Sequence, residues 1–317
     1  MAQKVHYEEL PSKTILNQVT APSMPFRWSI NPYRGCQHGC SFCYARATHT
    51  FMGVAADDTF QNHIFLKSNA AEALTEQLDK LARGKGGLSR LGQVAIGTAT
   101  DPYQQAEGNA RLTRSCLEVL AKYGVPVSIT TRSPLILRDL DVLKNLPAVT
   151  VNISLNTLDK TVWRSMEPST PSPKQRLETI AALVEADIQA GIFMAPILPY
   201  LTDAAEDLEE LIHEGARHQA KFMMSSFLRL STQEVKVWFF QTLRDRFPHL
   251  VSKYAALYQS SAYAPSSYRE PLKSLINDLL KRYGLNDVEA FRRLPTAGDV
   301  PAPQISENDP VQLSFSF

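Results

Sequence analysis

Three of the four cysteines of this 317-residue chain lie close together, at Cys36, Cys40 and Cys43. They form a C-x3-C-x2-C pattern inside the segment NPYRGCQHGCSFCYAR. Thiolates this close in sequence can wrap around one soft-metal centre. They can hold three irons of a [4Fe–4S] cluster, whose fourth iron then lacks a protein thiolate and is free to bind a small molecule.

Two other interpretations of the cysteines stay open. They are incidental or buried thiols in the first, although cysteines rarely cluster in this way without a ligand. They hold a structural zinc ion in the second, and structural zinc prefers four closed ligands. His38 is a candidate fourth ligand, but no second C-x-x-C and no H-x-x-x-H follows the motif. The spacing therefore favours the iron–sulfur cluster.

Short apolar runs alternate with longer helical segments along most of the chain. The short runs are rich in β-branched residues and predict strands over residues 27–31, 94–98, 127–131, 149–155, 192–197 and 222–228. Most of the segments between them have apolar residues at helical spacing and stop at glycine or proline. These segments predict helices over residues 69–83, 108–123, 136–146, 174–190 and 204–218.

The repeated strand–helix order predicts parallel strands joined by right-handed crossovers. A doubly wound sheet and a barrel both fit, and in either fold the chemistry belongs at the carboxyl ends of the strands. Beyond residue 230 the strands stop, and helices are expected over 232–248, 267–283 and 284–293. We divide the chain into an irregular lead-in (1–25), a core (26–230), a helical C-terminal extension (231–295) and a flexible tail (296–317).

The composition excludes several classes of protein. The net charge is +1, from 33 Lys and Arg against 32 Asp and Glu, which excludes a globally basic nucleic-acid coat and an acidic solvating protein. No apolar run reaches the roughly 18 residues of a membrane helix. The N-terminus, MAQKVHYEELPSK, lacks the apolar stretch of a signal peptide. We therefore expect a folded cytoplasmic protein.

The cysteine motif, with its aromatic residue before the third cysteine and the β/α series behind it, resembles the radical S-adenosylmethionine (SAM) superfamily. Within that superfamily it is similar to the group related to spore photoproduct lyase, often labelled "DNA repair photolyase". The segments GTATDPYQ, SITTRS, NISLNTLD, MEPSTPSPKQRLE and APILPYLTD are similar to later blocks of that group. The resemblance covers about residues 26–230 and implies an α/β fold, a partial (β/α)6 TIM-like barrel with a helical C-terminal extension.

The resemblance also implies the cofactors and the reaction. Cys36, Cys40 and Cys43 match the positions that bind a [4Fe–4S] cluster, and SAM binds the open iron. One electron from a reductant such as flavodoxin or ferredoxin then cleaves SAM to methionine and a 5′-deoxyadenosyl radical. That radical takes a hydrogen atom from the substrate, so the resemblance implies a radical SAM enzyme whose specific reaction is not assigned.

Under this resemblance, eight further residues are candidates for contact with SAM. They are Phe42, Thr98, Arg132, Ser154, Arg164, Ala195, Pro196 and Ile197. Arg132 stands where the group usually has a lysine facing the SAM carboxylate, and a guanidinium can do the same. Other interpretations stay open, because Thr98 and Ser154 are also ordinary strand residues and Arg132 can be a surface charge at a helix start.

One position departs from spore photoproduct lyase itself. That enzyme has a cysteine that returns a hydrogen atom to the product, and Ile96 stands at the matching position here. The spare thiol, Cys116, has the spacing of a core residue. We therefore do not expect repair of spore photoproduct. For Asp101, two interpretations stay open: it caps a turn, or it forms a substrate-facing wall with Tyr103 and Gln104.

The C-terminal residues suggest a partner. Gln312-Leu-Ser-Phe-Ser-Phe317 resembles peptides that dock on DNA sliding clamps. A second hypothesis follows, in which the chain is a non-enzymatic adaptor that binds zinc or a structural cluster and docks a partner through this tail. The substrate class stays open between nucleic acid and other molecules, because the six basic and four acidic residues of 261–294 are typical of a solvated helical surface.

Overall fold

The computed structural model describes residues 5–20, 24–52 and 57–287. Its main sheet has seven strands: β2 (Leu16–Gln18), β3 (Trp28–Ile30), β6 (Val94–Ile96), β7 (Val127–Thr131), β8 (Val149–Ser154), β9 (Gln189–Ile197) and β10 (Met223–Phe227). Their spatial order is β10-β9-β8-β7-β6-β3-β2. The six strands from β3 to β10 in this sheet run parallel, and β2 is antiparallel to β3. The predicted α/β fold of the partial-barrel type is therefore confirmed.

Each expected strand of the core exists, with shifts at the ends. The strand expected at 127–131 has the predicted bounds. The strand expected at 192–197 begins three residues earlier, at Gln189, because the chain turns out of the preceding helix at Asp187, where φ is +63°. A left-handed residue ends a helix and lets the strand start at once. The glycine at 191 instead lies inside β9, where a side chain would collide with the Phe222 carbonyl.

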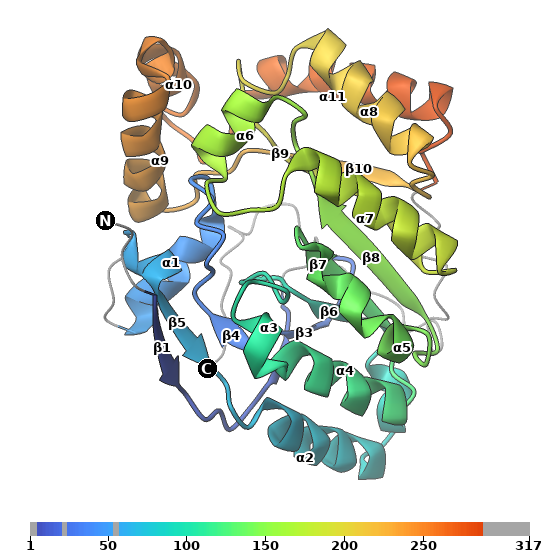
Figure 1. Ribbon diagram of the computed structural model, residues 1–317. Coiled ribbons are helices and arrows are strands. Elements are labelled where there is room, and N and C mark those ends of the chain that lie inside the picture. The colour runs from blue at the N-terminus through green and yellow to red at the C-terminus, as the bar shows by residue number, and fades with distance from the viewer. Residues whose placement is uncertain (1–4, 21–23, 53–56, 288–317) are drawn as a thin grey trace.

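The helices after the strands cover the outer face of the sheet (Figure 1). The main ones are α2 (Ala70–Arg83), α4 (Leu112–Lys122), α7 (Pro173–Glu185) and α8 (Ala205–Arg217). Shorter ones are η2 (Gly87–Arg90), α3 (Glu107–Ala110), η3 (Pro134–Asp139), α5 (Leu140–Leu143) and α6 (Lys160–Met166). The single helix expected at 108–123 is broken between α3 and α4 at Arg111, where φ is +51°.

The lead-in, expected to be mostly irregular over 1–25, contains two short strands in its described part. These are β2 and a further strand, β1 (His6–Glu9). β1 belongs to a second sheet of order β1-β5-β4, with β4 at Tyr33–Arg34 and β5 at His63–Leu66. All four β1 residues are exposed, so the sequence has no alternation of apolar and polar residues to signal a strand. Between β4 and β5 lie η1 (Tyr44–Met52) and α1 (Thr59–Asn62).

The C-terminal extension is helical over its described part. It comprises α9 (Gln233–Arg246), η4 (Pro248–Leu250), α10 (Val251–Leu257) and α11 (Ser266–Arg282). The helix expected at 284–293 is described only to residue 287, and those residues are not helical. The rest of that segment, the tail at 296–317 and the Gln312–Phe317 peptide lie outside the described residues. In the described chain, we find no helix with the length and apolar character required to cross a membrane.

The two largest apolar cores among the described residues hold these layers together. The larger one lies between the main sheet and its covering helices. The smaller one joins the extension to the segment that carries the cysteines, since Cys40 and Phe42 pack there with Phe239 and Tyr254. α9 packs against η1, which follows the third cysteine, and Figure 1 shows α9 and α10 together at one side of the molecule. The extension is therefore part of the surroundings of the cysteines.

Candidate functional site

The three cysteines lie on one loop at the carboxyl end of β3, which we call the cysteine loop (residues 35–43). Cys36 and Cys40 are buried, and Cys43 is partly exposed. The amide of Cys36 donates to the Phe60 carbonyl at 3.0 Å, so the loop is fixed to α1. Gly35 precedes it with φ at +79°, and a Cβ there would lie 2.7 Å from the His63 carbonyl oxygen. Only glycine fits this close approach.

Two guanidinium groups compensate the charge that three thiolates would bring. Burial raises the pKa of both Cys40 and Cys43. The charge of Arg132 opposes this rise at Cys40, and the charge of Arg46 opposes it at Cys43. Arg46 is fully buried, and its guanidinium carbon lies 4.0 Å from the Trp238 ring centroid. It donates to the Gly39 carbonyl at 3.3 Å. The loop thus has a fixed cation on either side, which favours the ionised thiols that bind metal.

The donor set of the loop fits a cluster better than a single zinc ion. Structural zinc prefers four closed ligands, and the loop offers three thiols. The histidine of the loop, His38, has its Nδ1 atom 3.2 Å from the Asp101 carboxylate. A [4Fe–4S] cluster accepts three thiolates and keeps one iron open. The donor set and its surroundings therefore fit a cluster with three cysteine ligands.

Asp101 ties the cysteine loop to the ends of β6 and β7. It lies 3.2 Å from Nδ1 of His38, and it accepts hydrogen bonds from the Thr131 hydroxyl at 2.6 Å and the Arg132 amide at 2.8 Å. Burial opposes its ionisation, but His38 and these donors lower the pKa of Asp101 to about 2. It also accepts from the Tyr103 amide at 2.9 Å. The turn-capping interpretation of Asp101 is thus confirmed, and its carboxylate is committed to the loop.

A pair of glutamines makes a second tie. The Gln104 side chain accepts from the Gln37 amide at 3.0 Å and donates to the Gly35 carbonyl at 3.2 Å. In return, the Gln37 side chain accepts from the Ala106 amide at 2.7 Å. Gln104 is fully buried. The segment after β6 that was a candidate substrate wall therefore serves largely to hold the cysteine loop.

Thr98 lies at the end of β6, where it joins two segments around the loop. Its hydroxyl accepts from the Asn31 amide group at 2.9 Å, and Asn31 in turn accepts from the Ala99 amide at 2.8 Å. The Tyr44 hydroxyl donates to the Thr98 carbonyl. Asn31 follows β3 and Tyr44 follows Cys43, so these bonds close the gap between two strand ends directly beside the cysteines.

Arg132, Phe42 and Ser154 are brought together through a buried ion-pair network. The Arg132 guanidinium lies 5.9 Å from the Phe42 ring centroid and donates from Nε to Glu167 at 3.0 Å. Glu167 is also paired with the fully buried Arg176, which donates to the Ser154 carbonyl at 3.0 Å. Burial opposes its ionisation, but the two arginines lower the pKa of Glu167. Arg132 is therefore an oriented cation, which differs from a free surface charge.

The remaining predicted residues divide into two groups. The 195–197 segment ends β9, and the Pro196 carbonyl accepts from the Asn156 side chain at 3.0 Å. This segment lies at the same sheet edge as the cysteine loop, since parallel strands share their carboxyl end. Arg164 does not join it, because its side chain is exposed on α6 and lies 5.7 Å from the Trp163 ring centroid. Cys116 is fully buried in the larger core.

A cavity of about 320 Å³ lies beside the cysteine loop. Its walls come from the cysteine loop, the segments after β6 and β7, and the segment after α6: His38, Tyr103, Gln105, Ser133, Leu135, Ser169, Thr170 and Pro171. Of the residues proposed as a substrate wall, Tyr103 does line this cavity. Asp101 and Gln104 do not, because both are engaged in the loop contacts described above.

Sequence reasoning missed the buried and half-buried polar residues that support the loop. Arg46, Gln37 and Asn31 lie inside the cysteine motif, and Arg176 lies inside MEPSTPSPKQRLE, but none had an assigned role. The signal available was their position, since charged and amide side chains inside a motif that must be buried need partners. Which partners they have is decided by segments far away in the sequence.

The family model for the radical SAM superfamily matches residues 30–214 of the chain. An uncharacterized protein of Mycobacterium tuberculosis is 36% identical over 288 residues, which covers 89% of this chain and 82% of that protein. An uncharacterized protein of Methanocaldococcus jannaschii is 26% identical over 256 residues, 80% of this chain and 90% of that protein. A Pseudomonas phage M6 protein named radical SAM Nalpha-GlyT isomerase is 26% identical, covering 59% of this chain and 37% of that protein.

Solved structures share the fold. A mutant of spore photoproduct lyase superposes with a TM-score of 0.64 at 17% identity, covering 87% of this chain and 79% of that one. The same enzyme complexed with dinucleoside spore photoproduct gives a TM-score of 0.62 at 16% identity, with the same coverage of both chains. At this identity the likeness concerns the architecture and not the reaction.

Proposed function

Because the chain belongs to the radical SAM superfamily, whose enzymes use a [4Fe–4S] cluster and SAM, we propose that Cys36, Cys40 and Cys43 hold that cluster. The observation that carries the proposal is the cysteine loop itself, at the carboxyl end of a parallel sheet between Arg46 and Arg132. The cluster and SAM supply the chemistry, which is reductive cleavage to a 5′-deoxyadenosyl radical that takes hydrogen from the substrate. An electron donor such as flavodoxin or ferredoxin is part of the proposal.

The chain's own residues bind and orient SAM in this proposal. Arg132 uses Nε for Glu167, so its terminal nitrogens are placed to bind the SAM carboxylate. Phe42 lies under the same guanidinium. Thr98 and Ser154 lie at the ends of β6 and β8, the strands on either side of β7, which Arg132 follows. The 195–197 segment forms an apolar wall for the adenine. Arg164 is the weakest of these candidates, because it is exposed on α6.

The cluster assignment is tested by anaerobic reconstitution with iron and sulfide, followed by dithionite, SAM and measurement of 5′-deoxyadenosine. We expect release from the unaltered chain and none from Cys36→Ala, Cys40→Ala or Cys43→Ala. Cys116→Ala is the matched control and keeps both the iron and the release, because that thiol is buried in the larger core. Retained cleavage in a reconstituted variant of the loop would overturn the assignment.

The same assay separates the enzyme from the adaptor. No release from a fully loaded cluster, with or without candidate substrates, would support a chain that binds metal only to hold its structure. A colourless protein that takes up zinc in place of iron would support the zinc form of that hypothesis. Family membership favours the enzyme, because the superfamily is defined by this chemistry.

The Arg132 role is tested by SAM binding to the reconstituted protein. Arg132→Gln is expected to weaken binding about 10- to 100-fold, the range for a lost hydrogen bond to a charged group. Arg246→Gln, on the exposed face of α9, is the control and leaves binding unchanged. Arg164→Gln is expected to have a smaller effect than Arg132→Gln. Equal affinity in the Arg132 variant and the unaltered chain would contradict the role.

We propose that the reaction is not repair of spore photoproduct. Ile96, at the position of that enzyme's hydrogen-donating cysteine, is 1% exposed, and Cys116 is fully buried. Neither can return a hydrogen atom to a product. Incubation of the reduced holoenzyme with SAM and dinucleoside spore photoproduct is expected to give no repaired dinucleoside. Its formation at catalytic levels would contradict the proposal.

A phosphate-bearing substrate is the class we favour, with nucleic acid as its main candidate. A cavity of about 350 Å³ lies between β10 and α11 and is lined by Ser225, Ser226, Phe227, Tyr263, Arg269, Lys273 and Asn277. Arg229 lies 5.7 Å from the Tyr263 ring centroid. Its positive charge also opposes the rise that burial causes in the pKa of Tyr44, which follows the third cysteine. Basic side chains can bind the phosphodiester backbone of a single strand, and aromatic rings can stack on its bases.

The test is binding of single-stranded DNA at increasing salt. A slope of log affinity against log salt of about −0.7 for each phosphate contact is expected. Lys273→Gln should weaken binding, and Lys281→Gln, exposed on the same helix outside the cavity, should not. No binding at low salt, or a flat salt response, would contradict a nucleic-acid substrate.

We also propose that the Gln312–Phe317 peptide docks on a DNA sliding clamp, on the support of its Gln-Leu-x-apolar-x-aromatic pattern alone. Short apolar anchors of this kind suit binding to a groove at modest affinity. A bacterial clamp should be recovered on the full-length chain and lost on a variant with Leu313→Ala and Phe315→Ala. Equal recovery on both would sink the docking proposal.

A further inference from the structure

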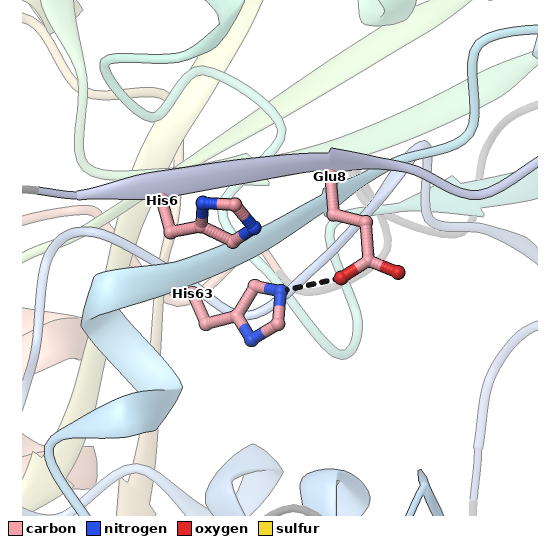
Figure 2. A group of neighbouring side chains, drawn as sticks. All are labelled: His6, Glu8 and His63. Carbon is pink, nitrogen blue, oxygen red and sulfur yellow. Dashed lines mark hydrogen bonds and ion pairs between the residues drawn. The ribbon is translucent and has the colours of Figure 1, made fainter.

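Two histidines and a glutamate converge on one face of the small sheet, at its β1–β5 pair. β1 and β5 pair in parallel with His6 opposite His63. Glu8 is two residues after His6, so its side chain lies on the same face of the strand. One ligand atom from each of the three side chains lies within 4.8 Å of the other two. Figure 2 shows the two rings and the carboxylate facing one another.

The contacts in this group are already those of a site that converges on one point. Nε2 of His63 lies 2.8 Å from the Glu8 carboxylate. The His6 and His63 ring centroids are 4.8 Å apart at 65°, so the rings meet edge to face and do not stack. Stacking on Phe65 at 4.3 Å fixes the His63 ring from its other side. The Glu8 side chain is 49% exposed, so an ion can enter from solvent.

We propose that His6, Glu8 and His63 bind a divalent transition-metal ion of the Zn²⁺ type. Two imidazoles and one carboxylate are a ligand set that zinc accepts, with water in the fourth position. Zinc binds nitrogen and oxygen at about 2.1 Å, so its ligand atoms lie about 3.4 Å apart in a tetrahedron. The observed 2.8 Å between His63 and Glu8 must open slightly, and the third ligand atom must move inward. The exposed side chains of His6 and Glu8 can make both of these small movements.

The ion would link β1 to β5, the strand that contacts the start of the cysteine loop. β1 has four exposed residues, so burial does little to hold it on β5. The carbonyl of His63 faces Gly35, one residue before Cys36, at a distance that excludes a Cβ. An ion on the His63 ring therefore orders the strand against which the cysteine loop is seated. Its role is structural and does not depend on the proposed reaction.

The test uses the full chain with Cys36→Ala, Cys40→Ala and Cys43→Ala, so that the loop thiols do not compete for the ion. Titration with Zn²⁺, followed by calorimetry, should reveal one equivalent bound. His63→Ala should abolish it, and Glu8→Gln should weaken it at least about 10-fold. Glu9→Gln, the exposed neighbour on the opposite face of β1, and His249→Ala, exposed elsewhere, are matched controls that keep the affinity.

A second measurement covers a cysteine variant that fails to fold. Zinc per chain is measured on the cluster-loaded protein after zinc exposure and washing, with Glu8→Gln against Glu9→Gln. Hydrogen exchange of the β1 amides should slow when zinc is bound to the unaltered chain and not in Glu8→Gln. The proposal is overturned if no zinc binds, or if the Glu8 and Glu9 variants bind it equally.

Discussion

Charged side chains around the cysteine loop are buried in matched pairs. Asp101 is paired with His38, and Glu167 with Arg176 and Arg132. Removing one partner of a buried pair leaves an uncompensated charge, which costs far more than the intact pair contributes. Arg46 is buried with hydrogen bonds to backbone carbonyls, so its charge remains available to the loop thiols. At the level of single residues, the site is therefore an electrostatic frame that favours bound anions.

A buried lysine away from the site gives a pH-dependent prediction. Lys67 is 7% exposed, and burial together with Arg34 lowers its pKa from 10.5 to about 8. Between these values the unfolded chain holds the proton and the folded chain releases it, so stability rises with pH. At 1.36 kcal/mol per pKa unit, the unaltered chain should gain about 3 kcal/mol relative to Lys67→Met between about pH 7 and 11.

Urea unfolding of the cluster-free protein at both ends of this pH range measures the gain. Below about pH 8 both states of Lys67 are protonated, so the difference between the two proteins should be constant there. If the difference in the free energy of unfolding between the unaltered chain and Lys67→Met does not change with pH, the pKa of Lys67 is not lowered in the folded chain.

The cysteine loop is held by elements that are distant in the sequence. Its amides donate to the carbonyls of Phe60 in α1 and Met166 in α6, at 3.0 and 2.9 Å. Gln104, after β6, holds it from a third side. These hydrogen bonds all join the loop to other segments, so the shape of the loop depends on how the surrounding elements pack. At the scale of elements, the site is a loop without regular structure that is fixed on three sides.

Gly35→Ala tests this packing. Both Gly35 and Gly92 have positive φ, so alanine at either position costs about 1–2 kcal/mol of backbone strain. At Gly35 the new Cβ would also lie 2.7 and 2.8 Å from two backbone carbonyl oxygens, whereas at Gly92 it meets nothing within 4 Å. We expect Gly35→Ala to cost a further 1–3 kcal/mol or so and to reduce iron loading.

Denaturant unfolding and iron content per chain measure the two effects, with Gly92→Ala as the control for strain alone. Comparable stability and full iron loading in both variants would mean that the loop does not need its close approach to β5.

At the scale of the whole molecule, the C-terminal extension completes the site. Trp238 of α9 stacks on Arg46, and side chains from α9 and α10 are part of the core that contains Cys40 and Phe42. An extension packed on the loop excludes water from one side of the proposed cluster position. The extension should therefore unfold together with the loop and not as an independent domain.

Phe239→Ala tests this coupling. Phe239 is fully buried in the smaller core, so its removal should cost about 3–5 kcal/mol. Val237, on the same helix, is 46% exposed, and Val237→Ala should cost little. Hydrogen exchange should show faster opening of both the extension and the cysteine loop in Phe239→Ala. Faster exchange confined to the extension would contradict a single cooperative unit.

The sequence by itself determined the strands of the core, their parallel order and the identity of the motif. Periods of two and 3.6 residues, glycine stops and the spacing of three cysteines are local features, and local features suffice to place β7 at 127–131. They fail where the local signal is weak, as in β1, or where one residue turns the chain, as at Arg111 and Asp187.

Only the tertiary structure decided which side chains meet. Asp101 pairs with His38 across more than sixty residues, and Arg46 stacks on Trp238 across nearly two hundred. His63 meets His6 because two strands that have no shared pattern lie in register. Such contacts follow from how elements pack in space, which no period or spacing in the chain encodes. The spacing of the cysteines therefore predicts the chemistry of the loop, whereas the charged side chains that surround the loop could not be predicted from the sequence.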